Sequence, residues 1–537
     1  MIVAATPTPT AIVAPTPTAR RAPSGVLNVS YSNLGNEVWL PRQVTTDEST
    51  VMNVIYEGLI KYEPKTATFP LDQLAEKWSA EPVGSEGSLW KFTLKKGIQF
   101  HGGWGEVTAE DFKFSLNEYF KPQSVNSGTF KNVEWIGKDI NNLKIVDKYS
   151  FEVQSPVRSA IFDRQMSSIS LMSKKYMESV GEEAYGKRPV GTGSLALTEH
   201  KRNEKVTFKA QTEHYRRVAD FAELNFFIVP EVSTRIAMLR IGQIDMTSIP
   251  ARYKRELEAA GLQIFRGETA TEIQLFFGGM FLTTRPKYDP TVPWAGREPL
   301  DESPSLVRKA MNLAIDRQAI LDKILLNEGY LTAIAFNYQK APVAWWKDDW
   351  KPYPYDPKAA KEALTKAGYP NGFDMNAYIM SLAWEPANEA ISEAIASMWE
   401  QNLGLRVKRQ NTEYRPTVRQ KLVERATAGW TYLYTNGGVT DPVNYGCGCC
   451  IGPSWATILH TEHPKVDEYC GPLLKELDMK KAIPLIQQLG DFLYQNYWNV
   501  PIGNGNSLYA AVKRVNSYTP WPGTAQMVNL ETVTLKR

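Results

Sequence analysis

The sequence predicts a mixed α/β protein with more than one domain. The chain has 537 residues, and domains of about 100 to 200 residues would divide it into two to four units. From Val26 to the end, strand patterns and helical patterns keep alternating, which is typical of α/β domains. Apolar residues make up 43% of the chain and charged residues 22%, so most of the chain has the composition of packed globular protein.

The first 25 residues differ in composition from the rest. MIVAATPTPTAIVAPTPTARRAPSG holds five Pro, five Thr and no acidic residue, and it shows no apolar periodicity. Proline fixes φ and lacks an amide donor, so this stretch favours extended, semi-rigid conformations. We expect residues 1–25 to be a disordered stalk. It is either a frayed terminus or a tether whose upstream export signal was removed, Met1 then being an added start.

A strand, a hairpin and a helix are predicted in the first third of the chain. The alternation in VLNVSYS predicts a strand at residues 26–32. WKFTLKKGIQF, residues 90–100, predicts a hairpin that turns at KKG. In VTAEDFKFSLNEYF the predicted helix begins after Thr108, and Asp111 supplies the carboxylate half of a capping box.

Three more helices carry clear start or stop signals. SPSLVRKAMNLAIDRQAILDKIL predicts two helices, the first capped by Ser303 and the second by Asp316. DPKAAKEALTKAGYP predicts a helix that Asp356 opens and Gly368 closes. Apolar residues recur at helical spacing, so we expect surface helices that pack one face onto a core.

Composition and motifs speak against several functional classes. The net charge of +3 is small and the basic residues are scattered, so no nucleic-acid partner is expected. No run approaches the roughly 18 to 20 apolar residues of a membrane span. With five His, no GxSxG and no GxGxxG or Walker-type loop, neither a Ser/His/Asp triad nor a nucleotide cofactor is indicated. A pair of carboxylates that cleaves glycosides stays an open alternative, because their separation is spatial.

Several segments follow one another in a recognisable order. They are YEGLIKYEP near Tyr56, LAEKW near Leu74, KFTLKKGIQFHGGWGEVTAEDFKFS, RPVGTGSLAL at Arg188, IGQIDM at Ile241, VRKAMNLAIDRQAI at Val307 and DPKAAKEALTKAGYPNGF at Asp356. Together they resemble the large solute-binding proteins of ABC importers, family 5, which includes oligopeptide-, dipeptide- and nickel-binding proteins.

The resemblance implies an α/β fold with two lobes, periplasmic-binding-protein-like, type II, of the large cluster that carries an extra inserted domain. It implies a division into residues 26–65, 190–285 and 500–537 for lobe I, 66–189 for an inserted subdomain, and 286–499 for lobe II. By this resemblance, the ligand is enclosed in the cleft between the lobes as a hinge closes.

The resemblance also implies a function. The chain would be an extracytoplasmic receptor that captures a peptide or a similar polar organic solute for the transmembrane subunits of an ABC importer. It would be a monomer without cofactor or catalytic activity. A lipid-anchored stalk would be its one link to the membrane.

The acid that would recognise a peptide is missing from its usual place. In the peptide binders that this chain resembles, an aspartate shortly before a DP dipeptide pairs with the α-ammonium of the peptide. Here the dipeptide is Asp441 and Pro442, and the position three residues earlier is Gly438. Burying an ammonium without a partner costs several kcal/mol, so a peptide would need another acid, such as Asp441 itself.

Aromatic residues favour an oligosaccharide as the alternative ligand. The chain has 15 Trp and 25 Tyr, and sugar rings stack on such flat faces while Asn and Asp bind their hydroxyls. For each aromatic, packing in a core is the competing interpretation. The candidate ligand-binding residues are Tyr31, Trp39, Phe277, Trp430, Asn436, Asp441 and Trp455.

Four cysteines lie close together near residue 450. Cys447, Cys449, Cys450 and Cys470 form an even, local set, which predicts disulfides in an oxidising compartment. Bridges between 449 and 450 or between 447 and 449 require awkward geometry, so pairing 447 with 450 and 449 with 470 is favoured. These bridges would hold the loop that carries Asp441 near the cleft.

Zinc is the sharper alternative for the cysteine region. His460 and His463 lie between Cys450 and Cys470, and thiolates with imidazoles suit zinc. C-x-C-C is not a standard zinc spacing, however, and His463 precedes Pro464, so the two His are not expected to share a helix face. We therefore expect no metal site, and a zinc enzyme remains the alternative from another functional class.

Overall fold

The computed structural model describes most of the chain beyond the expected stalk. The described residues are 22–44, 48–61, 73–121, 136, 139–156, 158, 162, 166, 169–336, 338, 344–382, 385, 387–437, 442–451, 461–521, 524 and 526–536. Of the predicted stalk, residues 1–21 lie outside this part, as do Asp441, Trp455 and His460.

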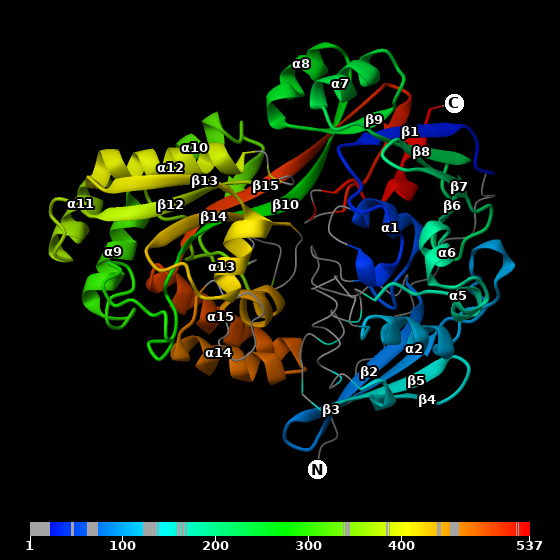
Figure 1. The fold of residues 1–537 in the computed structure, drawn as a ribbon, viewed down its shortest axis with the longest axis horizontal. Helices are drawn as coiled ribbons and strands as arrows, with labels where there is room; N and C mark the ends of the chain where they lie inside the picture. Colours follow the sequence, from blue (N-terminus) through cyan, green and yellow to red (C-terminus); the bar gives the residue numbers. More distant parts are fainter. Residues whose placement is uncertain are drawn as a thin grey trace.

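Within the described residues, one eleven-stranded sheet runs through both halves of the molecule (Figure 1). Its order is β13-β12-β14-β10-β15-β9-β1-β8-β7-β6, and β11 pairs with β15. The strands are β1 Val26–Tyr31, β6 Leu195–Lys201, β7 Lys205–Ala210, β8 Glu223–Ile228, β9 Met246–Ile249, β10 Gln263–Phe277, β11 Gly329–Leu331, β12 Asp374–Ser381, β13 Arg406–Glu413, β14 Trp430–Gly437 and β15 Val500–Ala511.

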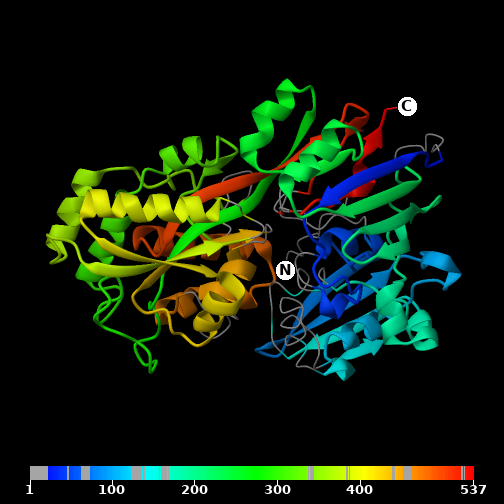
Figure 2. The ribbon, with the colours of Figure 1, turned by 45° about the horizontal axis from the view of Figure 1, so that its top comes forward.

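Two long antiparallel strands, β10 and β15, join the halves (Figures 1 and 2). Residues 263–267 of β10 pair with residues 507–511 of β15, and residues 271–275 pair with 500–505. The register shifts between Gly267 and Thr271. We call this irregular stretch the crossing, because it lies between the two hydrophobic cores that the strands enter.

The buried apolar residues define the two lobes. The largest core draws on residues 273–502, and we call the part around it the second lobe. The first lobe has a core built from residues 27–246 and 509–533, with a small core under the helices α7 (Val232–Arg240) and α8 (Lys254–Ala259). A further core of residues 59–190 surrounds a separate sheet, in the order β2-β3-β5-β4. Its strands are β2 Ala75–Val83, β3 Gly87–Leu94, β4 Leu143–Ile145 and β5 Ser150–Ser155.

The helices cover these cores. Those of the second lobe are α9 Glu302–Leu313, α10 Arg317–Lys323, α11 Pro357–Lys366, α12 Asn388–Leu403, α13 Arg419–Val423, α14 Pro464–Lys475 and α15 Met479–Gln495. The others are α1 Ser49–Ile55, α2 Ala109–Glu118, α5 Lys174–Val180, α6 Glu182–Lys187, α7 Val232–Arg240 and α8 Lys254–Ala259. A small hairpin, β16 Val515–Ser517 with β17 Thr534–Leu535, ends the chain. Of the helices described, none is long and apolar enough to cross a membrane.

Most predicted helix starts are confirmed. Thr108 and Asp111 form the capping box of α2. Asp316 accepts a hydrogen bond from the backbone of α10, and Asp356 caps α11 in the same way. The prediction that Ser303 caps a helix is wrong, because α9 already begins at Glu302. The Ser303 hydroxyl instead donates a hydrogen bond to the carbonyl of Ala367, just beyond α11.

The predicted hairpin at residues 90–100 is also wrong. β3 pairs on one side with β2 and on the other with β5, so both of its edges are already occupied. Beyond the turn at Gly97, Ile98 and Phe100 do not pair with β3, and their side chains are buried in the core of residues 59–190. A strand partner about 60 residues away has therefore replaced the local return strand.

Candidate functional site

The carboxyl ends of parallel strands from both lobes converge on the crossing. β12 pairs in parallel with β13 and β14, and β14 ends at Gly437, opposite Thr271 of β10. In the first lobe β1 is parallel to β8 and β9, and β9 ends at Ile249, opposite Leu508 of β15. Ligands of open α/β sheets bind outside the carboxyl ends of the strands. The convergence of these two edges is therefore the candidate ligand site.

Two candidate residues lie at these edges. Asn436 is next to the carboxyl end of β14, in register with Glu272 of β10. Tyr31 is the last residue of β1, where it is partly buried and in register with Ile228. Their positions fit a ligand that touches both lobes.

Trp430 lies at the opposite end of β14 from Asn436. They are six positions apart along the strand, which is about 20 Å at roughly 3.3 Å per residue. The Trp430 ring stacks on Tyr378 with centroids 4.0 Å apart, and the ammonium of Lys421 lies 5.6 Å from its centroid. The Trp430 ring is thus partly buried, and its contacts with Tyr378 and Lys421 are within the second lobe.

Phe277 and Trp39 are packed in cores. Phe277 is fully buried against Trp294, at the end of β10 far from the crossing. Trp39 is fully buried in the first lobe, where its ring meets His200 edge-on at 5.2 Å. Among the aromatic candidates that the structure describes, Phe277 and Trp430 are thus neighbours at the ends of β10 and β14 far from the crossing, while Trp39 lies in the first-lobe core. Asp441 and Trp455 lie outside the described residues.

The cysteine pairing expected from the sequence is wrong. The structure joins Cys447 to Cys470, with Cα atoms 5.4 Å apart, instead of pairing 447 with 450 and 449 with 470. The reason is that α14 packs against the segment Val443–Ile451, which places both side chains in the second-lobe core. The bridge ties the chain that follows the β14 edge to α14.

His463, one of the two His in the zinc alternative, is engaged in a structural role. Its Nε2 donates to a carboxylate oxygen of Glu298 at 2.6 Å, and its Nδ1 accepts from the Lys465 amide at the start of α14. Its ring also meets Trp498 edge-on. Over the part of the chain that the structure describes, no three His, Cys, Asp or Glu residues are grouped as metal ligands.

The buried carboxylate of Glu328 forms ion pairs beside the crossing. Glu328, which precedes β11 in the second lobe, binds Lys254 at the start of α8 and Arg266 of β10. Burial raises the pKa of Glu328, but the hydrogen bonds from Arg266 and Lys254 outweigh burial and hold that pKa below its ordinary value. The cluster connects an element of the first lobe to one of the second, beside the strands about which the lobes would move.

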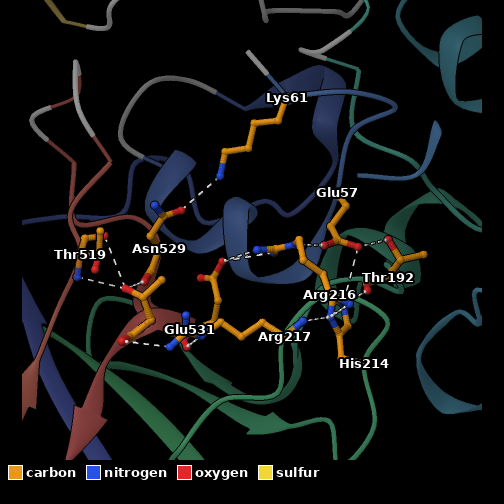
Figure 3. Close-up of polar contacts among 10 residues, drawn as sticks. Glu57, Lys61, Thr192, His214, Arg216, Arg217, Thr519, Asn529 and Glu531 are labelled. Atoms are coloured by element: carbon orange, nitrogen blue, oxygen red, sulfur yellow. Dashed lines mark hydrogen bonds and ion pairs between the residues drawn. The ribbon is translucent and has the colours of Figure 1, made fainter. Parts of the chain in front are cut away.

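A second cluster joins distant segments of the first lobe (Figure 3). Arg216 donates to Glu57 at 3.0 Å and to Glu531 at 3.1 Å. Thr192 also donates to Glu57, and His214 lies 3.6 Å from the same carboxylate. Burial raises the pKa of Glu57, but the hydrogen bond and charge of His214 and the charge of Arg216 bring that pKa below its ordinary value.

Glu57→Gln is expected to lower the free energy of unfolding at neutral pH by roughly 1.5 to 3 kcal/mol, because Arg216 loses a charged acceptor. Since the folded-state pKa of Glu57 is lowered, its contribution is present above the unfolded-state pKa of about 4.3. It is lost as the pH falls through the folded-state value. The variant should therefore lose less stability than the wild type between neutral pH and pH 3.

Urea unfolding at a series of pH values measures this difference. Glu204→Gln, which alters an exposed carboxylate beside β7, is the matched control and should follow the wild type. Parallel stability curves for wild type and Glu57→Gln would contradict the assignment.

Sequence reasoning did not single out Glu328 or Glu385. Glu385 follows the carboxyl end of β12 and contacts the crossing through Thr271. The one local signal for Glu385 is an acid shortly after a strand, and for Glu328 there is none, because its partners are distant in the sequence.

Comparisons with known proteins agree on one family. The family model described as bacterial extracellular solute-binding proteins, family 5 Middle, matches residues 70–450. The chain is 25% identical over 425 residues to heme-binding protein A of Haemophilus influenzae, covering 73% of this chain and 70% of that protein. It is 26% identical over 434 residues to the dipeptide-binding protein of Escherichia coli, covering 75% and 73%.

A solved structure shows the same fold. The periplasmic binding protein DppA from Helicobacter pylori, in complex with the peptide STSA, superposes with a TM-score of 0.71 at 21% sequence identity. The match covers 96% of this chain and 99% of that one. The architecture is thus that of the two-lobed periplasmic binding proteins, as the sequence predicted.

Proposed function

Because this chain belongs to the bacterial extracellular solute-binding proteins of family 5, we propose that it captures a peptide between its lobes for an ABC importer. The peptide would pass to the transmembrane subunits of that importer. The family places the protein outside the cytoplasm. The finer parts of the proposal are a monomer, a lipid-anchored stalk and no catalytic step.

The convergence of strand ends on the crossing is the observation that carries this proposal. A ligand there would contact carboxyl edges from both lobes, near Ile249 in the first and Gly437 in the second. Affinity that is higher in the closed arrangement would then draw the lobes together. Dipeptide-binding and peptide-bound relatives support a peptide as the ligand.

We also propose the lobe boundaries that follow from the cores. The inserted subdomain and the first segment of lobe I would keep their expected bounds, 66–189 and 26–65. The second segment of lobe I would end near residue 267 instead of 285, and lobe II would begin near residue 271 instead of 286. At the other end, lobe II would extend past residue 499 to about residue 505.

An oligosaccharide has weaker support as the ligand. That alternative depends on aromatic faces at the site, and Trp39 and Phe277 lie in cores while Trp430 is stacked on Tyr378. A polar organic solute other than a peptide stays within the proposal, because one relative is a heme-binding protein.

A thermal-shift screen tests the proposed function. The purified protein is heated with pooled di- and tripeptides, and separately with pooled oligosaccharides. A ligand present at 100 times its dissociation constant adds about 2.7 kcal/mol to the stability of the folded state. We expect the peptide pool to raise the melting temperature. Stabilisation by the sugars alone would contradict the proposal.

A further inference from the structure

Glu385 holds a carboxylate against both strands of the crossing. It lies four residues beyond the end of β12 and just before α12. Its Oε2 accepts a hydrogen bond from the Thr271 hydroxyl of β10 at 3.0 Å. The same oxygen is 3.7 Å from the place that a Cβ on Gly505 of β15 would occupy. The other oxygen accepts from the Ala387 amide at 3.2 Å, so the orientation of the carboxylate is fixed.

The half-buried carboxylate of Glu385 differs in one respect from three fully buried carboxylates, those of Glu57, Glu328 and Glu462. Glu57 has Arg216 as a cationic partner, Glu328 has Lys254 and Arg266, and Glu462 has Arg285 and Arg425. Among the residues that the structure describes, no Lys, Arg or His forms an ion pair with Glu385. Both of its hydrogen-bond donors are neutral.

The lack of a cation leaves the charge of Glu385 uncompensated. Removal from water raises the pKa of Glu385 above its ordinary value, and the hydrogen bonds from Thr271 and Ala387 only partly oppose that rise. A desolvated carboxylate gains most from a cation that completes an ion pair, because two neutral donors do not balance its charge. The environment of Glu385 therefore favours the binding of a positively charged group.

The position of Glu385 makes a ligand the source of that cation. The side chain stands at the carboxyl edge of the second lobe, beside the crossing, where the strand ends of the two lobes converge. We propose that Glu385 binds the ammonium group of the ligand, which for a peptide is its free α-amino terminus. This assignment rests on the proposed function and adds the chemical group that the site recognises.

The contact with Thr271 gives this ion pair a second effect. Glu385 belongs to the second lobe, and Thr271 belongs to the strand about which the lobes would move. An ammonium bound to the carboxylate would lie against the crossing itself. Binding of the cation would thus neutralise a carboxylate that is hydrogen-bonded to the strand joining the two lobes.

Two peptide pools test the assignment. One pool contains di- and tripeptides with free α-amino groups, and the other contains the same peptides N-acetylated, which removes the positive charge. We expect the wild type to be stabilised by the free-amine pool and not by the acetylated pool. Equal stabilisation by both pools would overturn the role of Glu385 while leaving peptide binding intact. This comparison needs no variant, so it does not depend on how a variant folds.

Glu385→Gln then removes the charge and keeps the size of the side chain. By titration calorimetry with the free-amine pool, we expect an apparent dissociation constant at least about 30-fold higher than that of the wild type. Glu389→Gln, at an exposed position in the first turn of α12, is the matched control and should bind as the wild type does. Wild-type affinity in Glu385→Gln would overturn the assignment. A wild type that neither pool stabilises would overturn the peptide function as well.

Discussion

Replacing Glu462 by alanine is expected to lower the free energy of unfolding by about 3 kcal/mol. Its carboxylate is fully buried and accepts hydrogen bonds from Arg285, Arg425 and the Leu282 amide. Removing one member of a buried ion pair typically costs about 3 to 5 kcal/mol, because the remaining charge is left without its partner. The lower end applies here, since both guanidinium groups are partly exposed to water.

Denaturant unfolding of the ligand-free protein measures this loss. Glu468→Ala, at an exposed position of α14, is the matched control and should change the stability by less than about 0.5 kcal/mol. If Glu462→Ala and Glu468→Ala unfold at the same denaturant concentration, the buried cluster does not stabilise the second lobe.

Replacing both Cys447 and Cys470 by alanine is expected to lower the free energy of unfolding by about 3 kcal/mol. The bridge closes a loop over a sequence separation of 23 residues, and the chain-entropy estimate for a loop of that size gives about this value. Both side chains are buried, so two small cavities add to the loss.

Reduction of the wild type provides the control for the disulfide. Reductant should lower the stability of the wild type by a similar amount and leave the double variant unchanged. Peptide mapping under non-reducing conditions should recover a cross-linked pair that contains Cys447 and Cys470. Recovery of Cys449 joined to Cys470 would contradict the structure and restore the pairing first expected from the sequence.

Local signals predicted local structure well. The capping pair Thr108 and Asp111 and the cap at Asp316 were readable because each contact spans three residues. The same holds for β1, whose alternating apolar residues Leu27 and Val29 are both buried in the first-lobe core. Two-lobed architecture came from the order of several such segments, through resemblance to a family and not through any single pattern.

Long-range packing could not be predicted in the same way. One partner of β3 is β5, which lies about 60 residues later in the chain, and no local pattern predicts that pairing. Phe277 and Trp39 have the residue type of a ligand contact and equally of a core, and tertiary packing decides between them. Cys470 meets Cys447 only because α14 folds back onto the segment Val443–Ile451.

The candidate site shows the same limit. Asn436 and Tyr31 could be proposed because each lies at or near the end of a strand, which sequence can place. Glu385 could not, because its significance comes from the hydroxyl of Thr271, more than 100 residues earlier in the chain. A carboxylate without a cation is recognisable once its neighbours in space are known.

The place of β15 in the main sheet has a consequence for the order in which the sheet can be completed. β15 comes from the last 40 residues or so, yet it lies between β10 and β9 and hydrogen-bonds to both. Until residues 500–511 have joined the sheet, it stays split, and the edges of β9 and β10 that β15 would cover remain unpaired. Such edges associate readily with other chains. A truncation before residue 500 should therefore leave the protein prone to aggregation and insoluble.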